Sequence, residues 1–340
     1  MTSPLSEPIT HAVTFGEAMI RVNTLFHERL ESSSTWTPTV GGTELNVAAG
    51  LRILGVRSAW VSALPENALG RFIARAAAAA RVDTDGITWV DEDEGRAGLY
   101  FLEEGTVPRP SSILYDRKDA AIATTDPARY DWPALLDGAG LLHVTGITLA
   151  LSANARQATM EAMRTARERG VTVSFDPNYR SRLWDKDEAG AAFAEAMPYV
   201  DILFASNDAL HEFFGLNGEG EALMRHALEM LGIDTITLTA KRGETSRDLA
   251  IRSVAMNARG EVAESVEYEI EVVDRIGGGD AYAAGFLAEY LAGSGDLARA
   301  VALGNAASAI KHTMPGDFLR ATREEIEAVA FGGQHGLLQR

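Results

Sequence analysis

The chain has 340 residues, no cysteine and a formal net charge of −17. The lack of cysteine excludes disulfides, thiol catalysis and cysteine metal sites, and the negative charge argues against nucleic acid or an anionic membrane as a partner. Hydrophobic residues make up 46% of the chain and charged residues 23%, as in ordinary globular proteins. Since no secretory signal or membrane-length apolar run is visible, we expect a cytoplasmic protein.

Strand-like and helix-like segments alternate along the chain. Apolar or β-branched runs predict strands at 11–15, 58–63, 140–145, 171–175, 200–204 and 235–239. Helical patterns lie between them at 68–81, 154–169, 189–197 and 219–231. This alternation predicts an α/β fold with a mostly parallel sheet covered by helices on both faces, whose ligands bind beyond the carboxyl ends of the strands.

Two segments interrupt the alternation. Residues 19–39 and 95–121 are polar, lean toward β structure and contain scattered glycine, proline and serine. From the residues alone they are either a small separate sheet or two irregular surface loops.

A glycine pair precedes the helix that is predicted directly after the first polar segment. Gly41 and Gly42 precede a segment with an apolar helical face, and Gly55 fits its C-cap. Glu44 and Asn46 fall in the first turn, where their side chains can reach a ligand over the glycines. The alternative is an ordinary helix start with a polar first turn.

Two arginine-containing segments give the clue to the substrate. Tyr115-Asp116-Arg117-Lys118 lies in the second polar segment, and Asn178-Tyr179-Arg180 follows a predicted strand. A guanidinium binds a carboxylate through paired hydrogen bonds that a neutral sugar does not require. Two arginines in one cleft would therefore indicate an anionic substrate. Composition alone favours the alternative, in which they are solvated or paired with local acids such as Asp116 or Asp185.

The most informative motif lies near the C-terminal end, where Gly277-Gly278-Gly279-Asp280 precedes a helical pattern that continues to Leu291. A glycine turn at a helix N-terminus binds anions through free N–H groups and the helix dipole. Asp280 stands where its carboxylate could accept a proton from a hydroxyl, which indicates phosphoryl transfer to an alcohol. The alternative is a plain glycine turn with Asp280 as the N-cap.

The two glycine motifs, in this order and far apart, resemble those of the PfkB/ribokinase family of carbohydrate kinases. The resemblance extends from about Val13 to about Val329. It implies one ribokinase-like α/β kinase domain over residues 1–340, with a small β-sheet lid formed from about 19–39 and 95–121. Such a lid excludes water and so protects ATP from hydrolysis.

The segments around Tyr115 and Tyr179 look most similar to those of 2-keto-3-deoxygluconate kinases, as does the stretch from Lys311 to Phe318. The closing residues 336–340 also resemble the tail of a subset of them. The resemblance implies that ATP phosphorylates the terminal hydroxyl of this sugar acid, with Mg²⁺ bridging the nucleotide phosphates. Asp280 would be the base, and the N–H groups of Gly277, Gly278 and Gly279 would stabilise the transferring phosphoryl group.

By the same resemblance, the sugar acid would contact eight residues, namely Gly42, Glu44, Asn46, Tyr100, Tyr115, Arg117, Arg180 and Asp317. Arg180 could contact a nucleotide phosphate instead. The nucleotide would contact Asn178, Lys241, Arg242, Gly243, Glu244, Thr245, Ser246, Gly277 and Gly279.

The chain departs from the family pattern at two places. The common Asn-x-x-Glu motif is replaced by Asn207-Asp208-Ala209-Leu210, so no metal ligand is assigned, although Asp208 could substitute. The common Gly-x-x-Gly of the nucleotide loop keeps only Gly243, since Ser246 stands in place of the second glycine.

Three other functions need to be weighed. The first is another PfkB-type activity, on fructose, a 2-ketoaldonate, ribose or a nucleoside, although a neutral substrate would leave Arg117 without a partner. A dinucleotide-dependent oxidoreductase fails because no Gly-x-Gly-x-x-Gly follows the first strand. A silent sugar-binding paralogue conflicts with an intact Asp280.

We expect a homodimer or higher homo-oligomer, because closed twofold pairing is the commonest assembly.

Overall fold

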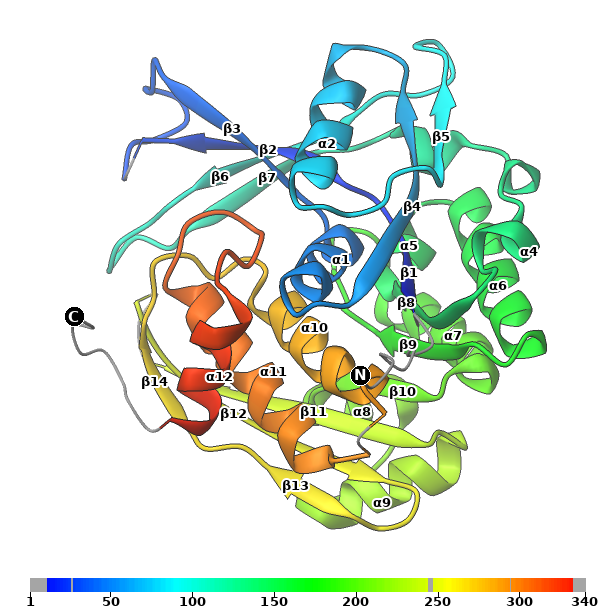
Figure 1. Ribbon diagram of the computed structural model, residues 1–340. Helices are drawn as coiled ribbons and strands as arrows, with labels where there is room; N and C mark the ends of the chain where they lie inside the picture. Colours follow the sequence, from blue (N-terminus) through cyan, green and yellow to red (C-terminus); the bar gives the residue numbers. More distant parts are fainter. Residues whose placement is uncertain (1–10, 26, 244–246, 294, 333–340) are drawn as a thin grey trace, which may run out of the picture.

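The computed structural model describes residues 11–25, 27–243, 247–293 and 295–332. Its main body is a large sheet with helices on both faces, and a smaller sheet stands beside it (Figure 1). None of the helices in these ranges has the length and apolar character needed to cross a membrane.

The large sheet is mostly parallel and runs in the order β13-β12-β11-β10-β9-β8-β1-β4-β5, with β14 also paired to β12. The strands from β11 to β5 pair in parallel, whereas β12, β13 and β14 add an antiparallel edge. The strands are β1 (His11–Phe15), β4 (Arg57–Pro65), β5 (Ile87–Val90), β8 (Ala139–Thr145), β9 (Thr172–Asp176), β10 (Ile202–Ala205), β11 (Thr235–Arg242), β12 (Asp248–Asn257), β13 (Val262–Glu264) and β14 (Tyr268–Glu271).

Alternate residues of the central strands enter two separate cores, because side chains of a strand point to opposite faces. Ala12 and Leu141 pack with the helices of one face, which are α1 (Thr43–Ile53), α10 (Gly278–Leu291), α11 (Leu297–His312) and α12 (Arg323–Phe331). Val13 and Leu142 pack on the other face, which is covered by α3 (Ala121–Thr124), α4 (Trp132–Leu135), α5 (Gly146–Leu151), α6 (Ala153–Glu168), α7 (Lys186–Ala196), α8 (Asn207–Phe214), α9 (Gly220–Leu231) and the 3₁₀ turns Pro127–Arg129 and Met197–Tyr199. The predicted fold is confirmed.

All six predicted strands are present. The prediction for β1 matches at both ends, and those for β9 and β10 begin one and two residues early. The predicted helices are also present, with ends that local capping explains. Helix α2 (Ala68–Ala79) ends before Arg81, which has φ 63°. Helix α7 begins three residues earlier than expected because Asp185 caps it and accepts a hydrogen bond from the N–H of Glu188.

The two polar segments form the small sheet rather than loops. Its strands are β2 (Met19–Thr24), β3 (Trp36–Gly41), β6 (Gly98–Glu103) and β7 (Ser112–Asp116), in the order β3-β2-β6-β7. Arg21 is opposite Tyr100 in the β2–β6 pair, and Tyr100 is opposite Tyr115 in the β6–β7 pair. The three side chains therefore lie in one row across one face of this sheet.

Candidate active site

A cleft of about 1250 Å³ lies between the small sheet and the carboxyl ends of the large-sheet strands. Tyr100 and Tyr115 line it from the small sheet. Asp176 and Lys241 line it from β9 and β11. This is the position that a parallel α/β sheet predicts for a ligand.

The glycine turn and Asp280 lie in this cleft. Gly277 is the N-cap of α10 and has φ 84°, so the helix begins at Gly278 and Asp280 is its third residue. The alternative in which Asp280 caps the helix is therefore wrong, since the N-cap is Gly277, which has no side chain. The N–H groups of the first turn remain available for an anion.

Asp280 is buried, and burial raises the pKa of its carboxyl to about 7. A hydrogen bond from Asn46 opposes this rise, and the nearby carboxylates of Asp176 and Asp317 add to it. Burial also raises the pKa of Asp176, to about 6. A carboxylate with a pKa near neutrality is suited to act as a general base.

The two glycine motifs meet at Asp280. Asn46 Nδ2 donates a hydrogen bond of 2.6 Å to Asp280 Oδ2, across 234 residues of sequence. Gly42 is the N-cap of α1, and its N–H donates a 3.4 Å hydrogen bond to Asn46 Oδ1. The amide of Asn46 thus orients the carboxylate that the sequence predicted as the base.

Glu44 is one residue whose surroundings the sequence did not indicate. Its Oε1 accepts hydrogen bonds from the hydroxyls of Thr145, at 2.6 Å, and Thr148, at 2.8 Å. Burial raises the pKa of its carboxyl to about 7. The carboxyl also lies against Gly16, where any Cβ would overlap it. Glu44 lines the cleft in a fixed orientation.

Arg117 forms an ion pair with Glu17, and both residues line the cleft. Asp116, the partner suggested by sequence, pairs instead with Arg96, whose Nη2 donates at 2.8 Å to its carboxylate. The expectation that a neutral substrate would leave Arg117 unpaired is therefore wrong. Residue spacing could not reveal Glu17 as the partner, because the two residues are 100 positions apart.

Arg180 also lines the cleft. It is exposed, and its Nη1 donates to the carbonyl of Tyr179 at 3.1 Å. Asp185, the other acid considered as a partner, is the N-cap of α7. Asn178 has φ 39°, and its N–H donates at 2.9 Å to Asp176 Oδ1. This tight turn directs residues 178–180 into the cleft.

The predicted nucleotide loop is only partly in the cleft. Lys241 lines it, whereas Arg242 pairs with Glu267 at 2.8 Å. A Cβ on Gly243 would overlap the carbonyl oxygen of Asp248, so glycine permits the close approach of β11 and β12. The predicted contacts of Glu244, Thr245 and Ser246, and the tail at 336–340, lie outside the described residues.

Within the described ranges, no three His, Asp or Glu side chains are grouped to hold a metal ion. Asp208 lies in the first turn of α8, which Ser206 caps, and it lines the cleft. A magnesium ion that arrives with nucleotide phosphates needs only one or two protein carboxylates. Asp208 and Asp176 fit this limited requirement.

Comparison with known proteins agrees with this geometry. Residues 9–319 match the model of the pfkB family carbohydrate kinases. A 2-dehydro-3-deoxygalactonokinase of Haloferax volcanii is 36% identical over 96% of this chain and 98% of its own. A 5-dehydro-2-deoxygluconokinase of Bacillus subtilis is 30% identical over 93% of this chain and 94% of its own.

A solved structure described as 2-dehydro-3-deoxygluconokinase from Thermotoga maritima superimposes with a TM-score of 0.90. It is 35% identical in sequence, over 94% of this chain and 98% of that one. These findings confirm the resemblance drawn from the two glycine motifs. The chain therefore belongs to the pfkB family of carbohydrate kinases.

Proposed function

We propose that the protein transfers the γ-phosphoryl group of ATP to the terminal hydroxyl of 2-keto-3-deoxygluconate, also called 2-dehydro-3-deoxygluconate. The products are the 6-phosphate and ADP. The observation that carries this proposal is the buried Asp280 carboxylate at the N-terminus of α10, in a cleft that also contains Arg117 and Arg180.

In this reaction the hydroxyl oxygen bonds to the γ-phosphorus while the bond to the ADP oxygen breaks. Asp280 accepts the hydroxyl proton, and the N–H groups after Gly277 stabilise the charge of the transferring group. Mg²⁺ bound to the nucleotide phosphates would neutralise developing charge. Asp208 and Asp176 would hold it.

The substrate assignment rests on the two arginines and on the deoxy-keto acids named for the relatives. Arg117 could hold the substrate carboxylate while Glu17 fixes its guanidinium on the other side. We also propose that the small sheet acts as a lid over the sugar, because it lines one wall of the cleft.

The Glu17–Arg117 pair also favours a second candidate, phosphorylation of a neutral sugar such as fructose. A paired arginine carries less net charge into the cleft, and hydroxyls can hydrogen-bond to both members of the pair. The wild-type enzyme can decide between the candidates.

The deciding experiment is a coupled ADP-release assay with ATP and Mg²⁺. The acceptors are 2-keto-3-deoxygluconate, its galactonate epimer, 5-keto-2-deoxygluconate, 2-ketogluconate, fructose and ribose. Highest kcat/KM with the first supports the proposal, and the epimer ratio gives the stereochemistry. Preference for fructose or ribose supports the second candidate, and no turnover with any acceptor rejects both.

Because the pKa of Asp280 is raised to about 7 and the base must be ionised, we expect kcat to fall as pH decreases through about 7. The acid limb should approach about tenfold per pH unit for a single ionisation. The measurement is kcat between pH 5 and 9 with saturating sugar acid and MgATP. A kcat that is constant down to pH 5 would contradict the predicted base.

Replacing Arg117 with methionine removes the carboxylate-binding group and leaves Glu17 buried and unpaired. We expect KM for the sugar acid to rise by about 10²-fold, since a charge-assisted pair is lost, with a smaller change in kcat. Arg96→Gln, which removes an exposed ion pair beside the same small sheet, is the control and should leave KM near the wild-type value. An unchanged KM in Arg117→Met would place the carboxylate elsewhere.

A further inference from the structure

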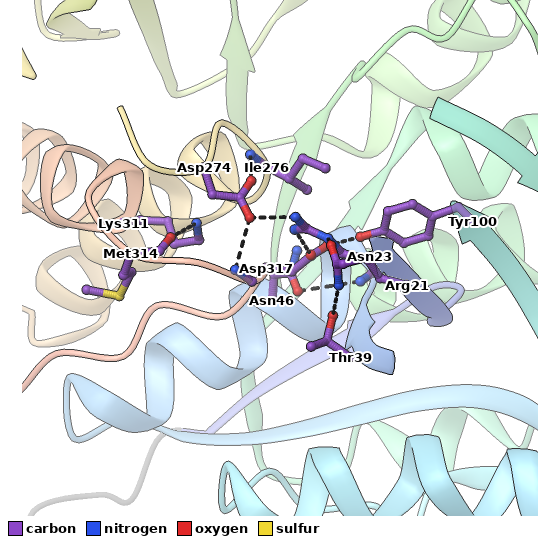
Figure 2. Close-up of polar contacts among 12 residues, drawn as sticks. Arg21, Asn23, Thr39, Asn46, Tyr100, Asp274, Ile276, Lys311, Met314 and Asp317 are labelled. Carbon is purple, nitrogen blue, oxygen red and sulfur yellow. Dashed lines mark hydrogen bonds and ion pairs between the residues drawn. The ribbon is translucent and has the colours of Figure 1, made fainter. Parts of the chain in front are cut away.

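A buried charge cluster joins the small sheet to the glycine turn (Figure 2). Arg21 of β2 is only 2% exposed, yet its guanidinium extends out of its own sheet. Nη2 contacts Asp274 Oδ2 at 2.6 Å, and Nη1 donates to Asp317 Oδ1 at 2.8 Å. Nε donates to Asn23 Oδ1 at 2.6 Å. Each nitrogen of the guanidinium is therefore engaged, and Arg21 holds two carboxylates of the main body at once.

Asp274 shapes the approach to the anion site. Its Oδ1 accepts a hydrogen bond of 3.0 Å from the N–H of Ile276, directly before Gly277. Its Oδ2, which Arg21 contacts, also accepts one of 2.9 Å from the N–H of Gly316. One carboxylate thus fixes the turn that presents the N–H groups of α10 and ties it to the loop after α11.

Asp317 supports the same turn from its other side. Its carbonyl oxygen lies so close to Gly277 that any Cβ there would overlap it. Its carboxylate is held by two side chains of the small sheet, since Tyr100 Oη donates to Oδ2 at 2.6 Å while Arg21 binds Oδ1. Arg21 and Tyr100 are register neighbours on β2 and β6, so one face of the small sheet holds this carboxylate.

The cluster is balanced in charge. Lys311 is fully buried, its Nζ donates to the carbonyl of Met314 at 3.3 Å, and its side chain packs against Gly277. Two cations, Arg21 and Lys311, accompany two carboxylates, Asp274 and Asp317. Removing one member leaves the buried charge of another uncompensated, so the position of each group depends on the others.

We propose that Arg21 is a positioning residue through which the small sheet sets the geometry of the anion site. It is not among the residues that line the cleft and acts through Asp274 and Asp317. When the small sheet is seated on the main body, the Gly277 turn has its catalytic shape and water is excluded. When Arg21 is lost, the Gly277 turn departs from this shape and water enters the cleft. This inference rests on the proposed phosphoryl transfer and adds a coupling between closure of the cleft and assembly of the site.

The test compares Arg21→Met and Arg21→Lys with wild type and with the control Arg96→Gln. We measure kcat, KM for the sugar acid, and the ratio of ATP hydrolysed by water to ATP used on sugar. We expect Arg21→Met to lower kcat by about 10²-fold, because small displacements of catalytic groups have effects of this size. KM for the sugar acid should rise less than kcat falls, because Tyr100 and Asp317 line the cleft but keep their own hydrogen bond. The hydrolysis ratio should rise several-fold. Arg21→Lys keeps the charge without the fork geometry and should fall between wild type and Arg21→Met.

The hydrolysis ratio separates positioning from a merely structural role. A protein that is only less stable has fewer active molecules, so its apparent kcat falls while the ratio stays at the wild-type value. That result, or a wild-type kcat in folded Arg21→Met, overturns the proposal. If Arg21→Met does not fold, Arg21→Lys decides by the same readouts, and wild-type values again overturn it. Wild-type turnover of the acceptor panel tests the proposed function separately, because it does not involve these variants.

Discussion

Asp280→Asn should reduce kcat by about 10²–10⁴-fold, the range that a positioned general base contributes. The carboxylate is buried at the start of α10 and is oriented by Asn46 at 2.6 Å. Asparagine has nearly the same shape but cannot accept the hydroxyl proton. The measurement is kcat at pH 8 with saturating substrates, and the exposed Asp93→Asn is the control. A variant that keeps a tenth or more of wild-type kcat would remove Asp280 from the role of base.

Asp176 is the competing carboxylate, since its pKa is also raised and it lines the same cleft. Asp176→Asn should therefore be measured beside Asp280→Asn. If the Asp176 variant loses turnover while the Asp280 variant retains it, the base is Asp176. We expect Asp280→Asn to lose the larger share of turnover, because Asp280 lies at the anion site. Asp176 is held by the turn at Asn178 and would share the Mg²⁺ with Asp208, so Asp176→Asn should weaken turnover less.

Although Asp280→Asn should lose turnover, the folded variant should be as stable as wild type or more stable at neutral and alkaline pH. The pKa of Asp280 is raised from 3.8 to about 7 on folding, so the folded state binds more protons than the unfolded state between these values. Its contribution to stability is therefore complete below about pH 4 and is lost as pH rises through about 7. Asparagine carries no buried charge at any pH. The variant should unfold at an equal or higher temperature than wild type at pH 8, and the difference should shrink at pH 5.

The strands and helices near the site could be predicted because their signals are local. A buried parallel strand is a short apolar run, as at β1, and a helix end needs only its cap, as Asn67 provides for α2. The antiparallel strands β12, β13 and β14 were not predicted. They lie at the edge of the sheet. The apolar runs of β12 are only three residues long and are separated by Arg252 and Ser253, and in β13 and β14 exposed and buried residues mix.

The contacts that define the site could not be predicted from pattern. Arg21 meets Asp317 across 296 positions, and Arg117 meets Glu17 across 100. No periodicity relates residues so far apart, and a charged residue in a short strand usually faces water. Strand alternation places Arg21 on the face of β2 opposite the buried Ile20, where a charged side chain would be expected in water, yet both residues are buried. Most of the predicted site residues in the described ranges line one cleft, whereas Arg242 and Gly243 do not. The sequence indicated which residues bear chemistry, and the fold decided their partners.

Gly277→Ala should damage both the fold and the reaction. Gly277 has φ 84°, a conformation unfavourable for residues with a Cβ, and a Cβ there would overlap the backbone oxygen of Asp317. We expect the free energy of unfolding to fall by about 2–5 kcal/mol from strain and overpacking combined. Turnover should fall as well, since a displaced Gly277 redirects the N–H groups at the start of α10. Chemical denaturation and kcat, measured on the same preparation, provide both values.

Gly279→Ala is the matched control, because the same change two residues later meets different surroundings. A Cβ at Gly279 has no atom within 4 Å and no positive φ to strain, so the free energy of unfolding should stay within about 1 kcal/mol of wild type. The added methyl group would enter the cleft, where we place the transferring phosphoryl group. Gly279→Ala should therefore fold normally and still lose kcat. If Gly279→Ala kept full turnover, the phosphoryl group would lie elsewhere. If both variants were equally stable, the strain expected from a Cβ at Gly277 would be contradicted.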